Sequence, residues 1–150
     1  MIFKSKSKLI IYTDGGSRGN PGPAAFGYVI QDETGLVIKR QGAAIGIKTN
    51  NEAEYAAVIA ALKKAKQMLG KEKLKHAIIE VRMDSELAVR QLSGAYKIEN
   101  KGLQPLFMEL WNLRVELGGT IVFKHIPREE NKEADRMVNE ALDAEQNRLF

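Results

Sequence analysis

The spacing of apolar and polar residues predicts strands in the first third of the chain and a mixture of helices and strands after it. Three apolar stretches, rich in β-branched and aromatic residues, cover residues 8–13, 24–30 and 36–46. Gly and Pro residues separate the first two stretches, and an Asp-Glu-Thr-Gly turn separates the second from the third. Closely spaced strands joined by turns are typical of an antiparallel meander.

A long helix is predicted to follow the meander, over about 50–69. Thr49 and Glu52 together spell a capping box, although Asn50 offers a competing cap at the same place. Alanines recur along this segment, so the helix has a narrow face that can lie close to a sheet. Gly70 is expected to end the helix.

The second half of the chain alternates between strands and helices. The expected elements are a strand over 77–83, a helix over 86–92, a helix over about 103–117, a strand over 120–126 and a helix over 132–146. Ser85 and Asn131 stand where side-chain oxygens cap helices. Trp111 lies among leucines, so we expect it in the core. The order βββαβααβα predicts an α/β fold: helices flank a five-stranded mixed sheet made of the antiparallel meander and parallel strands.

The composition is that of a globular protein, with 44% apolar and 28% charged residues. At 150 residues the chain has the size of one domain, spanning 1–150, and we expect flexible ends at 1–7 and 147–150. It has no cysteine, which excludes thiolate metal sites and a cysteine nucleophile. No stretch has the length of a signal-peptide core or a membrane span. We therefore expect a cytoplasmic protein with no membrane partner, and a compact monomer.

The net charge of +4 arises from 23 basic and 19 acidic residues and indicates only that a polyanionic partner is tolerated. Lysines gather in two groups, one within residues 4–8 and one within 63–75. A lysine group on a helix is usually a solvated face, and nucleic-acid binding is the alternative.

Four acids occupy positions from which they can meet. Asp14 and Asp84 each directly follow an apolar strand, and parallel neighbouring strands would bring both carboxylates to one sheet edge. Glu54 and Asp135 fall in the first turns of helices, where the helix dipole by itself also favours an acid. Taken together, converging carboxylates without cysteine favour Mg²⁺ or Mn²⁺. Two such ions about 4 Å apart suit in-line hydrolysis of a phosphodiester.

Four motifs carry a family resemblance: T-D-G-G-S-x-G-N-P-G-P, T-N-N-x-A-E, M-D-S and P-R-E-x-N-K-E-A-D. In this order and spacing the chain resembles type 1 ribonuclease H over residues 8 to about 142. The resemblance implies a ribonuclease H-like fold and hydrolysis of the RNA strand of RNA/DNA hybrids, leaving 5′-phosphate and 3′-hydroxyl ends, with two Mg²⁺ or Mn²⁺ ions. It also implies an acidic quartet, which falls on Asp14, Glu54, Asp84 and Asp135. In that quartet Asp14 would bridge both ions, Asp135 would share the ion that activates the water, and Glu54 and Asp84 would hold the other.

The same resemblance implies two groups of substrate contacts. Asn20 and Asn50 resemble residues that reach sugars and 2′-hydroxyl groups in the minor groove, which distinguish RNA from DNA. Thr49 and Asn51 match a pocket for a phosphate of the DNA strand, and Asn100 is expected to belong to it. Capping and turn formation are the alternative roles for all of these residues.

Two features depart from the family pattern. Many members carry a basic protrusion where this chain has only Gly94–Gly102, with Lys97 and Lys101 as its basic residues. His125 lies in an apparent strand, so we interpret it as a strand-end residue rather than the family's loop histidine. The sequence does not decide whether duplex RNA is also cleaved. Two alternative functions also stay open: a non-catalytic module that binds hybrids or duplexes, and a DNA nuclease or resolvase with the same fold.

Overall fold

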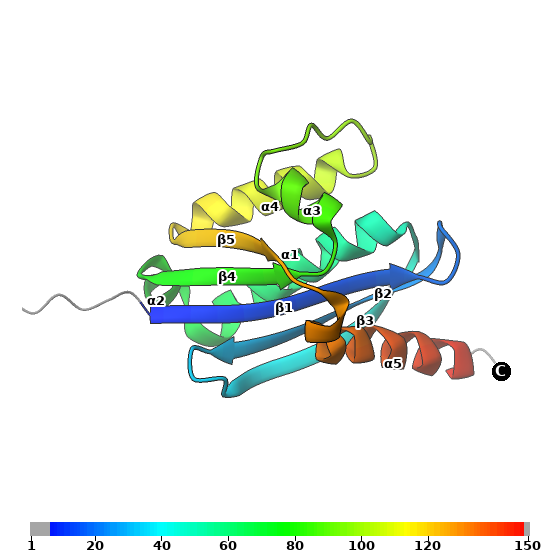
Figure 1. The fold of residues 1–150 in the computed structure, drawn as a ribbon, viewed down its shortest axis with the longest axis horizontal. Coiled ribbons are helices and arrows are strands. Elements are labelled where there is room, and N and C mark those ends of the chain that lie inside the picture. The colour runs from blue at the N-terminus through cyan, green and yellow to red at the C-terminus, as the bar shows by residue number, and fades with distance from the viewer. Residues whose placement is uncertain (1–6, 149–150) are drawn as a thin grey trace, which may run out of the picture.

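The computed structural model describes residues 7–148 and contains a five-stranded mixed sheet in the order β3-β2-β1-β4-β5 (Figure 1). Its strands are β1 (Ser7–Ser17), β2 (Gly22–Asp32), β3 (Val37–Lys48), β4 (Ala77–Met83) and β5 (Thr120–His125). The first three strands pair antiparallel, whereas β4 runs parallel to β1 and β5 runs parallel to β4. The predicted α/β fold, a meander extended by parallel strands, is confirmed.

Helices lie on both faces of this sheet (Figure 1). They are α1 (Asn50–Leu69), α2 (Lys71–Lys75), α3 (Glu86–Leu92), α4 (Gln104–Leu117) and α5 (Lys132–Arg148), and a 3-10 turn, η1 (Arg128–Glu130), precedes α5. The sequence pattern did not predict α2 or η1. The capping box at the start of α1 is confirmed, because Thr49 Oγ1 accepts from Glu52 N and Glu52 Oε1 accepts from Thr49 N.

Three glycines of the sheet let the backbones of α1 and α5 come close to the sheet backbone, because a Cβ at these positions would collide with the helices. A Cβ added to Gly27 would lie 2.4 Å from Ala134 O, and one added to Gly42, which is paired with Gly27 across β2 and β3, would lie 2.3 Å from Met137 O. Both glycines therefore face α5.

On the other face of the sheet, a Cβ on Gly15 would lie 2.2 Å from Ala53 C of α1. Asp14 is directly opposite Gly27 in the β1–β2 ladder, so Asp14 shares the α5 side and Gly15, the next residue, faces α1. Helices α1 and α5 thus meet β1 from opposite sides at neighbouring residues.

Strand β1 does not end at Asp14 as the glycine-rich sequence indicated. It continues through Gly15 and Gly16 to Ser17, because β2 is long enough to pair with these residues antiparallel. The tight turn therefore begins only after Ser17. Asp14 is nevertheless at the end of the parallel pairing with β4, whose last rung joins Thr13 and Met83.

The structure describes only part of the two ends that were expected to be flexible, 1–7 and 147–150. Ser7 begins β1 and pairs with Ala77, while Asn147 and Arg148 complete α5. The rest of the two predicted flexible ends, 1–6 and 149–150, lies outside the described residues.

The main core lies between the sheet and the helices α1, α3 and α4. Leu110, Leu113 and Leu117 of α4 are buried in it, but Trp111 is 51% exposed, which contradicts its expected place in the core. The reason is its position, one residue beyond Leu110 and therefore off the apolar stripe that three- and four-residue steps define along α4.

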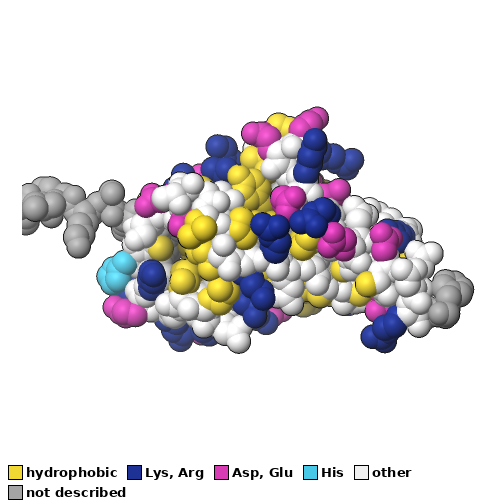
Figure 2. Space-filling model, turned by 90° about the horizontal axis from the view of Figure 1, so that it is seen from below, with side chains coloured by type: hydrophobic (Ala, Val, Ile, Leu, Met, Phe, Trp, Pro, Cys, Tyr) yellow, Lys and Arg dark blue, Asp and Glu magenta, His cyan; other side chains and the backbone are white. Residues whose placement is uncertain are grey.

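Basic and acidic side chains are interspersed on the face shown in Figure 2, with apolar side chains between them.

Within residues 7–148, no helix combines the length and the apolar character needed to cross a membrane.

Candidate active site

All four predicted acids line one open cleft of about 400 Å³. Asp14 comes from β1 and Asp84 directly follows β4. Glu54 comes from the first turns of α1, and Asp135 from the first turn of α5. Four separate segments therefore contribute one carboxylate each. Asp14 and Asp84 are neighbours because both follow the last rung of the parallel β1–β4 ladder.

Burial makes Asp14 the most perturbed acid of the cleft. It raises the pKa of Asp14 from 3.8 to about 8, first through loss of solvent and then through the negative charge of Asp84 and contact with the Asp135 carboxyl. A hydrogen bond from the Gly15 backbone only partly offsets the rise in pKa. A positive charge in the cleft would therefore stabilise the ionised form of Asp14.

Glu54 is held in a similar way from the opposite face of the sheet. Burial raises its pKa from 4.5 to about 7, and the Asp84 charge adds to this, while a hydrogen bond with Ser85 and the nearby Arg128 guanidinium lower it. Its Oε2 atom is buried and has no hydrogen-bond partner. An unpaired buried carboxylate oxygen is unfavourable unless a cation or a donor reaches it.

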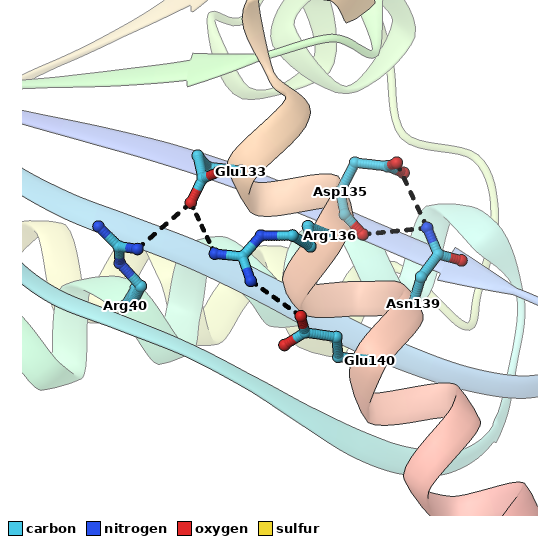
Figure 3. A network of polar contacts seen from close by, with 6 residues as sticks. All are labelled: Arg40, Glu133, Asp135, Arg136, Asn139 and Glu140. Carbon is cyan, nitrogen blue, oxygen red and sulfur yellow. Dashed lines mark hydrogen bonds and ion pairs between the residues drawn. The ribbon is translucent and has the colours of Figure 1, made fainter.

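Asp135 differs from these two acids because it is exposed on α5. Figure 3 shows its carboxylate turned toward Asn139, whose Nδ2 donates to Asp135 O at 3.1 Å and to Asp135 Oδ2 at 3.3 Å.

A separate ion-pair network connects α5 to β3 (Figure 3). In it Glu133 Oε2 contacts both Arg40 at 3.4 Å and Arg136 at 2.9 Å, and Arg136 also binds Glu140 at 2.8 Å.

The carboxylates share the cleft without meeting at one point. Within residues 7–148, no three His, Cys, Asp or Glu side chains lie close enough together to be a formed metal centre. Their chemistry still fits a hard divalent cation, because the donors are carboxylate oxygens and two of the four acids have raised pKa values caused by burial. The unpaired Glu54 Oε2 is a further oxygen that a cation would satisfy.

Asn20 and Asn50 lie together where the β1–β2 hairpin meets the start of α1. Asn50 N donates to Asn20 Oδ1 at 3.0 Å, and Asn50 Oδ1 accepts from Ser17 N at 2.9 Å. Asn50 also lines the cleft of the four acids. The hairpin is therefore fixed to α1 by exposed amides, next to the acids.

Thr49, Asn51 and Asn100 form the other predicted group. Thr49 caps α1, and Asn51 is half-buried in the first turn of that helix. Asn100 Oδ1 accepts from Gly102 N at 2.7 Å, and a Cβ on Gly102 would lie 3.6 Å from the Oε2 atom of the capping-box Glu52. The Asn100 loop and the capped start of α1 are thus adjacent, and Thr49, Asn51 and Asn100 are not among the residues that line the acidic cleft.

Comparison with known proteins shows which family the chain belongs to. A model of the "Reverse transcriptase-like" family matches residues 12–141. The crystal structure of LC11-RNase H1, isolated from compost by a metagenomic approach, is 49% identical and superimposes with a TM-score of 0.87, covering 93% of this chain and 98% of that one. The chain belongs to the type 1 ribonuclease H family. A second structure, that of LC11-RNase H1 in complex with an RNA/DNA hybrid, is 48% identical with a TM-score of 0.87, and the alignment covers 92% of this chain and 99% of that one.

Curated relatives within the ribonuclease H family are longer. Ribonuclease HI of Halobacterium salinarum is 40% identical over 132 residues, which are 88% of this chain and 63% of that protein. A bifunctional protein of Mycobacterium tuberculosis is 39% identical over 138 residues, which are 91% of this chain and 36% of that protein. The chain thus spans about a third to two thirds of the length of these relatives.

Both departures from the ribonuclease H pattern are visible in the fold. The segment between α3 and α4 is a short loop in which Lys97 and Lys101 are exposed, so the basic protrusion is absent there. His125 is the last residue of β5 and is not among the residues lining the cleft, as expected of a strand-end histidine.

Three lysines of the 63–75 group are paired with acids of α4. Lys63 Nζ lies 2.7 Å from Glu109 Oε1, while Lys66 and Lys71 both contact Glu116. A solvated, ion-paired face therefore explains these lysines.

Several cleft residues were missed by sequence reasoning. Arg128, Lys132 and Asn139 line the cleft beside the acids, and Arg128 acts on the pKa of Glu54. Asn131 is buried, and its side chain does not act as the predicted helix cap: Nδ2 donates away from α5 while Oδ1 has no hydrogen-bond partner. The available signal was the P-R-E-x-N-K-E-A-D motif, in which Arg128, Asn131 and Lys132 all lie close to Asp135 in sequence.

Proposed function

We propose that this chain is an endoribonuclease that hydrolyses the RNA strand of RNA/DNA hybrids. The observation that carries the proposal is the cleft that Asp14, Glu54, Asp84 and Asp135 line together. A close relative in the same family has been crystallised with an RNA/DNA hybrid, which supports the choice of substrate.

Asp14, Glu54, Asp84 and Asp135 would hold Mg²⁺ or Mn²⁺ in this proposal, two ions in all once substrate is present. Ribonucleases H generally use divalent metal ions. When bound, two such ions supply activation of a water for in-line attack on the phosphodiester and stabilise the leaving oxygen, giving 5′-phosphate and 3′-hydroxyl ends.

The protein's own contribution is to keep the acids ready for that charge. Asp14 and Glu54 are held in buried positions where ionisation is unfavourable, so their carboxylates favour a cation over water. Asp135 supplies a carboxylate from the exposed side, where substrate enters. Arg128 and Lys132 at the rim keep the cleft from repelling a polyanionic strand.

Substrate recognition is assigned to the two amide-rich groups. Asn20 and Asn50 lie beside the cleft and would contact the sugar edge and 2′-hydroxyl groups of the RNA strand. Thr49, Asn51 and Asn100 surround the capped start of α1, where backbone N–H groups favour a phosphate of the DNA strand. Without a basic protrusion, affinity for the hybrid depends on these contacts and on few phosphate-binding cations, so its dependence on salt is expected to be shallow.

Two further proposals concern the whole chain. The described residues form one sheet with one main core, so we propose a single ribonuclease H domain. We also propose that it acts as a monomer, because one chain supplies all four acids.

The test is cleavage of an end-labelled RNA strand presented in an RNA/DNA hybrid, in duplex RNA and alone, in Mg²⁺ and in Mn²⁺. Cleavage of the hybrid that disappears in Asp84→Asn is the expected result. Cleavage of duplex RNA as well would widen the substrate range, and cleavage of DNA strands would favour a DNA nuclease or resolvase. Hybrid binding without cleavage in either metal would contradict the proposal and indicate a binding module.

A further inference from the structure

Asn131 is a buried amide that contacts two of the strands around the acids. It lies between η1 and α5, and it is 1% exposed. Its Nδ2 atom donates to Thr13 O at 2.9 Å and to Asp84 Oδ2 at 3.1 Å. A carbonyl and a carboxylate oxygen are both acceptors, so the atom between them must be the NH₂ end of the amide.

These contacts connect Asn131 to three of the four acids. Asp84 is bound directly, and Asp14 is the residue after Thr13. The backbone of Asn131 also begins α5, because its carbonyl accepts from Asp135 N at 3.1 Å. One residue therefore joins the ends of β1 and β4 to the first turn of α5, across sequence separations of 118 and 47 residues.

Stability alone is a poor explanation for an amide at this place. Its Oδ1 atom is buried without a hydrogen-bond partner, which is an unfavourable state. An apolar side chain would avoid that unpaired oxygen, but it would leave Thr13 O and Asp84 Oδ2 without this donor. The amide is therefore better explained by what its N–H groups hold in place.

We propose that Asn131 is a positioning residue, which orients the Asp84 carboxylate and fixes the Asp14 strand end relative to the Asp135 helix. The inference rests on the proposed function, since it concerns how the cation-binding carboxylates are arranged. Residues that orient metal-binding carboxylates through hydrogen bonds raise metal affinity and rate without touching the substrate.

The test compares Asn131→Ala and Asn131→Ser with the wild type and with Leu113→Ala, a core substitution on α4 away from the cleft. Serine keeps a polar group but is too short to reach both Thr13 and Asp84, and it serves if the alanine variant does not fold. Two quantities are measured well below each variant's Tm: kcat and KM for the hybrid, and Mn²⁺ affinity by calorimetry without substrate.

We expect the Asn131 variants to lose about 10- to 100-fold in kcat and in Mn²⁺ affinity, while KM for the hybrid changes little. Leu113→Ala should lower Tm but keep both quantities near the wild-type values. If the Asn131 variants lower only Tm, as Leu113→Ala does, Asn131 is merely structural and the inference is overturned. If the wild type itself does not cleave the hybrid, the proposed function fails, whereas the Mn²⁺ affinities still decide the role of Asn131.

Discussion

Helices α1 and α5 each bring one acid to the cleft, but they bury very different surfaces in doing so. Helix α1 is rich in alanine and buries eight of its 20 residues, so Glu54 emerges from a dry, closely packed helix. Helix α5 buries only four of its 17 residues and carries ion pairs on its outer side, so Asp135 stands in water. The cleft thus has a dry side and a wet side.

This difference separates two requirements of a metal-dependent site. On the dry side, burial raises the pKa of Glu54, which makes its carboxylate a better partner for a cation than for water. On the wet side, Asp135 is exposed to solvent, the side from which substrate would enter in the proposed function. Asp14 lies between the two sides and has the more strongly raised pKa, about 8.

The largest effect is expected at Asp14, where the two sides meet. Asp14→Asn should lower the cleavage rate by at least about 10³-fold, because the loss of a cation ligand removes several kcal/mol of transition-state stabilisation. Single-turnover cleavage of a hybrid measures this. A variant that keeps a near-wild-type rate would remove Asp14 from the proposed site.

The same variant should be more stable than the wild type at pH 8 when divalent ions are chelated. The folded-state pKa of Asp14, about 8, is above its unfolded value of 3.8. The folded protein therefore holds the extra proton between these two values and loses stability as the pH rises through them. Asparagine removes this penalty, which is on the order of 5 kcal/mol at pH 8 and below about 1 kcal/mol at pH 4. Melting curves across this pH range give the answer, and a gain that persists at pH 4 would contradict the explanation.

The next effect tests how closely α1 approaches the sheet. Gly15→Ala should destabilise the fold by about 3 kcal/mol, since its Cβ would lie 2.2 Å from backbone atoms of α1. Gly16→Ala is the matched control, because its Cβ would lie 3.7 Å from Val138 Cγ1, an ordinary contact, and should change stability by less than about 0.5 kcal/mol. Chemical denaturation measures both variants. Equal losses would show that the backbone contact is not what limits this position.

A smaller effect separates the dry acid from the wet one. Glu54→Gln should stabilise the ion-free protein by up to about 3 kcal/mol at pH 8, because burial raises the pKa of Glu54 to about 7 and ionising it in the folded state therefore opposes folding. The gain should vanish at pH 4, where both states hold the proton. Asp135→Asn, on the exposed side, should change stability by less than about 1 kcal/mol. If the two substitutions gave equal changes at pH 8, the distinction between a dry and a wet side would fail.

The smallest effect is expected for the ion pairs on the outer side of α5. Arg40→Ala removes one partner of Glu133 and should lower stability by less than about 1 kcal/mol, because both side chains are largely exposed. Raising the salt concentration should reduce the difference from the wild type further. Thermal melts at low and high salt test this, and a loss that does not depend on salt would indicate packing by the Arg40 stem instead.

Most helices and strands could be predicted from the sequence, because their capping residues and apolar patterns depend on residues close to one another in the chain. The capping box at Thr49 and the alternation over 77–83 are decided by neighbours in sequence, and both match the structure. The extension of β1 past Asp14 was missed because its glycines form a strand only with β2 as partner. Helix α2, only five residues long, has too few turns for a periodic pattern.

In the candidate site, too, contacts between residues that are distant in sequence could not be predicted. The motifs identified the four acids that line the cleft, although their roles as ligands stay predictions. Asn131 was interpreted as a helix cap because it stands just before a helix, where asparagine is favoured. Its partners, Thr13 and Asp84, are far away in sequence, so no local rule could indicate them.

The glycines beneath α5 have a consequence for engineering. At Gly27 and Gly42 the backbone of α5 lies so close to the sheet that no side chain fits between them, so any larger residue at these two positions would push the helix outward. A designer who wished to move these carboxylates onto a new scaffold would therefore keep glycine at both positions before choosing the apolar residues around them.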